Sequence, residues 1–229
     1  MLSHAPVAAP LPGMSVTVYN MMVTHAFAVV GIPESSLQRL AFFDHVQYSL
    51  GGALFSLNDV ENGVLRRNRT PPYHLRLPFA EKDVRLSLLL DNDEPRIHFA
   101  LNCGASSCPA VKTYTAVGIE EELATAAAAF CEQDGNVLPD TREGKRSLKV
   151  SKIVYWYPSD FGSDGNEVAR RFAAWALPGS EKKEALEELA GGKPTRLKFF
   201  EYDWATNASE HKVFDVNRSR EEHSLCVVQ

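Results

Sequence analysis

Residues 96–109 constrain the fold most, because an apolar run there passes directly into a tight turn. The segment Ile97–Leu101 has the length and composition of a short buried strand, and the glycine and serine residues after it predict a turn. Two of the chain's four cysteines, Cys103 and Cys108, lie in this turn. A thiol at the end of a buried strand is therefore where we expect any chemistry of this chain.

The remaining pattern predicts a mostly helical α+β fold with a small sheet and a β-hairpin. Helices are expected at Val16–Val30, Glu34–Phe43, Gly118–Gln133, Asn166–Leu177 and Glu181–Ala190. Strands are expected at Ser147–Val150 and Arg196–Trp204. The pair Gly51-Gly52 between two apolar runs is typical of a hairpin turn. Because no internal repeat or linker is evident, we predict a single domain.

The boundaries of that domain follow from composition. Residues 1–15 are a short lead rich in proline and alanine, which predicts disorder, and residues 205–229 form a polar tail. The predicted domain therefore spans residues 16–204. Inside it, Ser56 is placed to begin a helix, because its hydroxyl can accept the backbone N–H of Asp59 three residues later. Glu61 then lies in the first turn of that helix.

Charge and composition exclude several classes of protein. The net charge is −5 and the isoelectric point is about 5.8, whereas nucleic-acid-binding proteins usually carry a basic patch. No apolar run approaches the roughly 18 residues that would span a bilayer. The first 13 residues show no charged segment followed by an apolar one, so we predict no secretory signal and a cytoplasmic location in which thiols stay reduced.

The cysteines allow two interpretations. Four residues separate Cys103 from Cys108, which is not the two-residue spacing of thioredoxin-like sites or zinc knuckles. A disulfide between them is geometrically possible. In the functional interpretation Cys103 is a nucleophile, His98 or His25 is its base, and Gly104 exposes backbone N–H groups to an oxyanion. In the structural interpretation Cys103 is a small buried side chain and Cys108 is structural.

Two polar residues, Asn20 and His25, interrupt the apolar segment Val16–Val30. Buried polar groups are costly unless they are hydrogen-bonded, so the pair either bonds backbone groups of the hairpin or belongs to an active-site face. In the second case Asn20 or Glu61 would orient the base of Cys103. No pair of histidines and cysteines has zinc-ligand spacing, so we predict neither a metal nor a cofactor.

The final four residues, Cys226-Val-Val-Gln229, match a C-a-a-X box, which directs prenylation of the cysteine in eukaryotic cells. The preceding residues carry both signs of charge and supply no polybasic segment. A single lipid holds a protein on a membrane only weakly. The motif therefore predicts Cys226 as a lipidation site and a peripheral membrane association.

Several motifs occur in a fixed order along the chain. They are Val18-Tyr19-Asn20 through His25, Tyr48-Ser49-Leu50-Gly51-Gly52, Ser56-Leu57-Asn58-Asp59-Val60-Glu61, Ile97-His98-Phe99-Ala100-Leu101 with Cys103-Gly104, and Lys152-Ile153 through Asp160-Phe161-Gly162. Together they make the chain resemble the DUF547 family, a domain of unknown function, over about residues 16–204.

The resemblance implies a largely helical α+β domain and supplies no established catalytic residue. The segments Pro71-Pro72-Tyr73 and Tyr202-Asp203-Trp204 resemble the branch of the family that follows glutaredoxin and sometimes DEP domains. Two functions therefore stay open. One is a cysteine-dependent hydrolase or transferase at Cys103, and the other is a non-catalytic interaction or scaffolding module beside redox or signalling proteins. The partner would be a protein or a small molecule, and not a nucleic acid.

Overall fold

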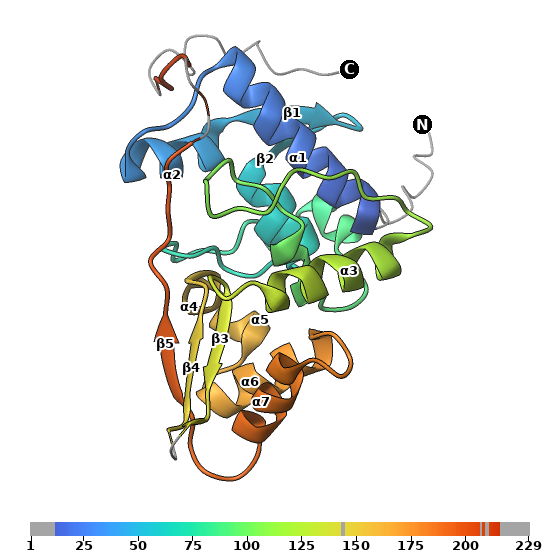
Figure 1. The fold of residues 1–229 in the computed structure, drawn as a ribbon. Helices are drawn as coiled ribbons and strands as arrows, with labels where there is room; N and C mark the ends of the chain where they lie inside the picture. The colour runs from blue at the N-terminus through green and yellow to red at the C-terminus, as the bar shows by residue number, and fades with distance from the viewer. Residues whose placement is uncertain (1–11, 143–144, 207, 209–210, 216–229) are drawn as a thin grey trace. The chain divides into compact units, whose positions relative to one another are not determined.

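A computed structural model describes residues 12–142, 145–206, 208 and 211–215. These residues form two compact units. The first unit takes its described residues from 1–93, 101–117 and 204–229, and the second comprises 94–100 and 118–203. Helices predominate over two small sheets in Figure 1, which confirms the predicted α+β class.

The first unit begins with helix α1 (Pro12–Val29). Proline is favoured at the first position of a helix because its fixed φ suits the helix and its missing N–H is not needed there. The last four residues of the predicted disordered lead therefore belong to α1, whereas residues 1–11 lie outside the described part of the chain. Helix α2 (Ser36–His45) follows, with Ser35 and Gln38 forming a reciprocal capping box.

The predicted hairpin is present. Strands β1 (Gln47–Leu50) and β2 (Ala53–Ser56) pair antiparallel, and both connecting glycines have positive φ angles, +60° at Gly51 and +84° at Gly52. The chain continues into the π-helix η1 (Asp59–Leu65) and, further on, the 3-10 helix η2 (Val84–Leu88). All residues of η1 from Val60 onwards are buried, and η1 packs against α1.

The second unit contains the aromatic core. The 3-10 helix η3 (Pro95–Phe99) packs on α3 (Ile119–Glu132). Strands β3 (Val137–Asp140), β4 (Ser147–Val150) and β5 (Arg196–Phe199) form a sheet in which β3 and β4 are antiparallel and β4 and β5 parallel. Between β4 and β5 lie α4 (Ile153–Trp156), α5 (Pro158–Phe161), α6 (Gly165–Trp175) and α7 (Glu181–Ala190).

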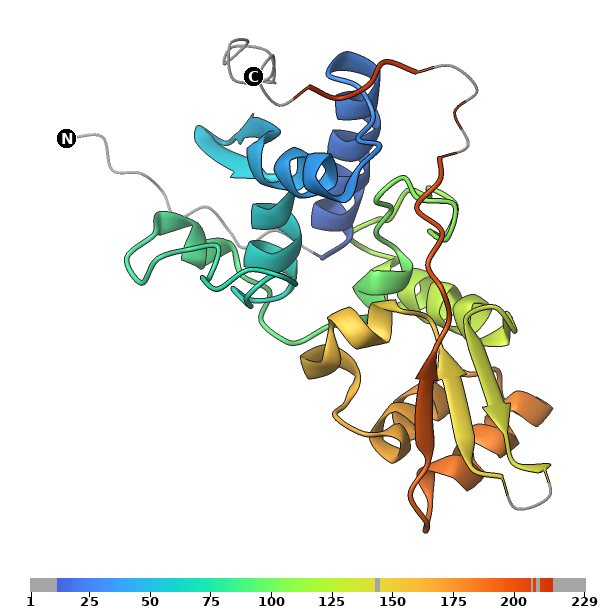
Figure 2. The same cartoon turned by 90° about the vertical axis from the view of Figure 1, so that its left-hand side faces the viewer.

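Helices α6 and α7 pack together on one face of this sheet, as Figures 1 and 2 show. Phe172 of α6 is fully buried and stacks parallel to Phe161 of α5, with ring centroids 5.9 Å apart. Phe99 and Phe130 extend the same aromatic cluster, their centroids 4.2 Å apart. Burial of these large aromatic rings therefore stabilises the second unit, because aromatic side chains remove more apolar surface from water per residue than smaller ones do.

The predicted strand Ile97–Leu101 is wrong. Residues 95–99 form η3 instead, because Pro95 fixes a helical φ at its first position and the Glu94 carboxylate accepts the N–H of Arg96. Ala100 N–H then closes the turn on the Ile97 carbonyl at 2.9 Å. A short apolar run fits a buried strand or a buried helical turn equally well, so periodicity could not separate the two.

The packed chain also extends past the predicted boundary at residue 204. Phe214 is fully buried in the first unit, with its ring 5.2 Å from that of Phe42. Its N–H donates to the Ile32 carbonyl at 3.0 Å, and its own carbonyl accepts the Gln38 amide at 3.0 Å. This part of the predicted polar tail therefore contributes to the core.

Candidate functional site

Of the three cysteines that the structure describes, the two partly exposed ones, Cys103 and Cys108, lie in residues 102–109 of the first unit, a segment that we call the thiol loop. The side chain of Asn102 holds the two ends of this loop together. Its Oδ1 accepts the Gly104 N–H at 2.7 Å, and its Nδ2 donates to the Pro109 carbonyl at 2.6 Å. A turn between Cys108 N–H and the Ala105 carbonyl, 2.9 Å long, tightens the middle. The loop is thus fixed by its own hydrogen bonds.

Helix α1 anchors the thiol loop from outside. Asn20 Oδ1 accepts the Asn102 N–H at 2.9 Å, so the predicted orienting residue acts on the start of the loop. Seven residues further along α1, on the same helix face, Phe27 packs against Gly104. A Cβ at Gly104 would lie 2.1 Å from this ring, and its φ of +82° is unfavourable for other residues. Glycine is therefore required at this contact.

The two sulfurs of the loop are in contact. Cys103 Sγ lies 3.0 Å from Cys108 Sγ, and the Cys103 N–H donates to Cys108 Sγ at 3.3 Å. An N–H directed at a sulfur stabilises negative charge on it. Cys108 is therefore the immediate chemical partner of Cys103, a role that its sequence spacing did not suggest.

The backbone of the thiol loop offers fewer free donors than the sequence predicted. The N–H groups of Gly104, Ser106 and Cys108 donate to Asn102, Ala205 and Ala105 respectively. A donor already engaged in the protein cannot stabilise an oxyanion without breaking that bond. The expectation that Gly104 exposes its N–H to an oxyanion is wrong, because Asn102 takes it.

Cys131 contrasts with the loop cysteines. It is fully buried in α3, and this burial raises the pKa of its thiol to about 12. A thiol of that pKa carries almost no thiolate at neutral pH, and the thiolate is the reactive form. Cys131 is therefore an internal control for reactivity.

His25 is directed elsewhere on α1. At 100° per residue it lies about 140° around the helix from Asn20, and its Nδ1 bonds the Tyr48 hydroxyl at 2.7 Å. Tyr48 donates its single proton to the Met22 carbonyl, so His25 Nδ1 acts as the donor to the Tyr48 hydroxyl. The ring is exposed beside the hairpin, and its role as a base for Cys103 stays a prediction.

Glu61 and His98 are buried, and each is hydrogen-bonded to another side chain. Glu61 Oε2 accepts the Tyr19 hydroxyl at 2.9 Å, within the first unit. His98 belongs to the second unit, where its Nε2 lies 2.8 Å from Asp160 Oδ2 and its ring centroid lies 4.2 Å from that of the tilted Tyr157 ring. Of the predicted site residues, the structure therefore links Asn20 to the thiol loop, and it bonds His98 to a carboxylate that the sequence analysis did not single out.

A second polar cluster in the first unit was also missed. Asp44 contacts both the side-chain amide of Asn58 and His74 Nε2, and Asn58 Oδ1 accepts from Asn62 Nδ2 at 3.1 Å. Arg66 donates to Asn62 at 2.7 Å and completes the chain of contacts. The sequence signal was the Asn58-Asp59 motif, but only the fold brings Asp44 and His74 to it.

His74 makes the stability of this cluster depend on pH. Burial lowers the pKa of His74, but the Pro72 carbonyl at Nδ1 and the Asp44 carboxylate at Nε2 outweigh it and raise the pKa above 6.5. Both ring nitrogens face acceptors, and only the charged imidazolium donates at both. The contribution of His74 to the stability of the folded state is therefore complete at pH values below the pKa of His74 in the unfolded chain. It is lost as the pH rises through the higher pKa that His74 has in the folded chain.

We expect His74→Gln to cost about 0.5 to 1 kcal/mol near pH 5.5 and much less near pH 8.5, since the pair is partly exposed. Urea unfolding at a series of pH values measures this difference. His45→Gln, an exposed histidine on α2, is the matched control and should show no such trend. A cost for His74→Gln that is equal at both pH values would contradict the charged pair.

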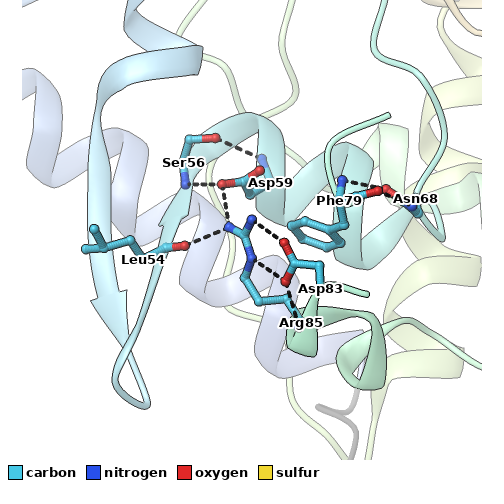
Figure 3. Close-up of polar contacts among 7 residues, drawn as sticks. All are labelled: Leu54, Ser56, Asp59, Asn68, Phe79, Asp83 and Arg85. Carbon is cyan, nitrogen blue, oxygen red and sulfur yellow. Dashed lines mark hydrogen bonds and ion pairs between the residues drawn. The ribbon is translucent and has the colours of Figure 1, made fainter. Parts of the chain in front are cut away.

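Figure 3 shows how Arg85 ties the hairpin to η1 and η2. Its guanidinium donates to the Leu54 carbonyl at 2.8 Å, to Asp59 at 3.0 Å and to Asp83 at 2.8 Å. The predicted Ser56–Asp59 cap is present at the helical turn that leads into η1: Asp59 N–H donates to Ser56 Oγ at 3.0 Å, and Ser56 N–H donates to the Asp59 carboxylate at 2.9 Å. Because Arg85 hydrogen-bonds its carboxylate, the pKa of Asp83 is lowered. These interactions fix the elements that carry the polar cluster.

The described residues contain neither a metal-binding cluster nor a membrane-spanning helix. No three histidine, cysteine, aspartate or glutamate side chains within the described ranges gather closely enough to hold a metal ion. In the same part of the chain, no helix has the length and apolarity to cross a membrane.

The fold and the site define an α+β protein with a pair of cysteines in the thiol loop, which is fixed by hydrogen bonds. A family model described as "Protein of unknown function, DUF547" matches residues 15–131 of the 229. The chain belongs to the DUF547 family. The match begins within α1, includes the hairpin, η1 and the thiol loop, and ends within α3. No curated protein and no solved structure matches the chain.

Proposed function

We propose that the thiol loop is a cysteine-dependent site in which Cys103 is the nucleophile of a transferase or hydrolase. The observation that supports this most directly is the 3.0 Å contact between the sulfurs of Cys103 and Cys108, both of which are partly exposed. The Cys108 sulfur, in direct contact with the Cys103 sulfur, is placed to accept the thiol proton of Cys103. The loop thus supplies a nucleophile and a proton acceptor side by side.

The hydrogen bonds already made by the backbone N–H groups of the thiol loop favour a transferase over a hydrolase. Acyl hydrolysis needs free donors at a developing oxyanion, and the N–H groups of Gly104, Ser106 and Cys108 are already engaged. Transfer to a thiol from a soft electrophile makes no such demand. Transferase-like chemistry on a small-molecule or protein substrate is therefore the form of the proposal that we favour.

A thiol-reactive acylating reagent at neutral pH tests this proposal. We expect the wild-type protein to be labelled on Cys103 and the Cys108→Ser variant to be labelled there more slowly, because the proton acceptor is lost. Cys131→Ser, the matched control, should be labelled like the wild type, since the pKa of about 12 keeps the Cys131 thiol protonated. Equal labelling of the thiol loop in wild type and Cys103→Ser would overturn the proposal.

An exposed apolar loop supports a second candidate, a non-catalytic interaction module. Tyr73 and Leu75 are 75% and 100% exposed, and Leu77 follows at 55%. Large exposed apolar side chains in one segment are typical of protein-binding surfaces. Such a module would suit a partner in redox or signalling proteins, as the resemblance to the glutaredoxin- and DEP-associated branch implies. In this case Cys103→Ser would leave partner binding intact, whereas Tyr73→Ser with Leu75→Ser would abolish it.

We further propose that Cys226, which lies outside the described residues, is prenylated in a eukaryotic cytoplasm and holds the chain peripherally on membranes. The support is the C-a-a-X match alone. Fractionation of cells that express wild type and Cys226→Ser measures the membrane-bound share. We expect the variant to lose membrane partitioning, because the lipid is the only anchor proposed. Unchanged partitioning would refute the assignment.

A further inference from the structure

We propose that Cys103 and Cys108 are a modification site at which hydroperoxides form a reversible intramolecular disulfide. The inference deepens the proposed function, because its regulatory consequence rests on Cys103 being the nucleophile. Formation of the disulfide itself does not depend on that role.

The distance between the two sulfurs carries this inference. At 3.0 Å they lie about 1 Å farther apart than the roughly 2.05 Å of an S–S bond. A bond between them therefore needs a movement of about one ångström, shared between two side chains. Two cysteines held in this way react with each other far more readily than with a thiol in solution, because the entropy of bringing them together is already lost in the fold.

The hydrogen bonds of the thiol loop hold this arrangement in place. Asn102, directly before Cys103, bonds both Gly104 and Pro109, which directly follows Cys108, and Asn20 fixes Asn102. Ser106, between the cysteines, donates from both its N–H and its hydroxyl to the Ala205 carbonyl, at 2.7 and 2.9 Å. None of these contacts uses a sulfur, so all of them can persist when the disulfide forms.

The chemistry balances with a hydroperoxide as the oxidant. The Cys108 thiolate attacks the peroxide, an S–O bond forms and the O–O bond breaks, and the leaving alkoxide or hydroxide takes the proton of the Cys103 thiol. The Cys103 thiolate then attacks the Cys108 sulfenic acid, an S–S bond forms, and hydroxide leaves and takes up a proton from solvent as water. Two electrons pass from the two sulfurs to the peroxide. A dithiol reductant reverses the step by thiol–disulfide exchange.

Oxidation would switch off the proposed function. In the disulfide, Cys103 has no thiol to attack a substrate, and Cys108 has no anion to accept a proton. Because the reductant restores both, the modification is a reversible control of the site and not damage to it.

Trypsin allows a direct test, because cleavage after Arg96 and Lys112 places both cysteines in the single peptide 97–112, with Cys131 and Cys226 in other peptides. The full chain is treated with hydrogen peroxide, free thiols are alkylated in denaturant, and the peptides are weighed. We expect peptide 97–112 to be unalkylated and lighter by two hydrogens than the dithiol form, and to recover after dithiothreitol. Cys108→Ser should yield no such peptide, whereas Cys131→Ser should behave as wild type.

The same samples separate the inference from the proposed function. Acylation of Cys103 should fall at least about tenfold in oxidised protein and return on reduction. A peptide 97–112 that stays fully alkylated, or that gains only oxygen, overturns the disulfide even if Cys103 of the reduced protein is acylated. A disulfide in a protein whose reduced form shows no Cys103 acylation supports the modification site and overturns the proposed function.

Discussion

Replacing Asp160 with alanine is expected to lower the free energy of unfolding of the second unit by about 3 to 5 kcal/mol. The Asp160 carboxylate lies 2.8 Å from His98 Nε2, and the two side chains are 4% and 3% exposed. Without it, the imidazole N–H keeps its place among the rings of Tyr157 and Phe161 and has lost its acceptor. Removing one partner of a buried pair costs more than the pair contributes, because the other polar group stays desolvated.

Urea unfolding followed by tryptophan fluorescence measures this loss. Asp160→Asn keeps the size and one acceptor oxygen, so we expect it to cost clearly less than the alanine variant. Glu201→Ala, whose side chain is 99% exposed 3.9 Å from Lys152, is the control in the same unit and should cost under about 0.5 kcal/mol. If Asp160→Ala were no more costly than Glu201→Ala, the His98–Asp160 pair would not be a structural element.

The second large effect is expected at Phe214, in the C-terminal part of the described chain. Phe214→Ala should destabilise the first unit by about 3 to 5 kcal/mol, because it empties a fully buried site beside Phe42. The neighbouring Val213 is 44% exposed, so Val213→Ala should cost about 1 kcal/mol or less. Thermal and urea unfolding of the three proteins give the comparison. Equal losses for the two variants would show that the segment does not pack in solution.

Local signals in the sequence predicted most of the helices and the hairpin. The pattern Ser56 to Asp59 predicted a cap that is present, and Gly51-Gly52 predicted a turn whose positive φ angles only glycine adopts readily. The helix Glu181–Ala190 begins and ends at the predicted residues. These features depend on residues within a few positions of one another, which is why the sequence contained them.

Other features of the fold depend on contacts between distant parts of the sequence, so local sequence patterns could not predict them. Strand β3 was missed because its Pro139 argues against a strand, and its pairing with β4 decides the matter. Phe214 has a polar neighbourhood in sequence, and its burial follows from contacts with Ile32, Gln38 and Phe42, more than 170 positions away.

The chain by itself determined that a turn with two cysteines would follow the apolar run 97–101 and that one helix would carry Asn20 and His25. Only the tertiary structure decided which of these residues meet. The rotation of α1 directs Asn20 to the loop and His25 to Tyr48, because positions five residues apart face different sides of a helix. The four-residue spacing of Cys103 and Cys108 gave no measure of their distance. The side chain of Asn102 brings the loop ends together, and with them the two sulfurs.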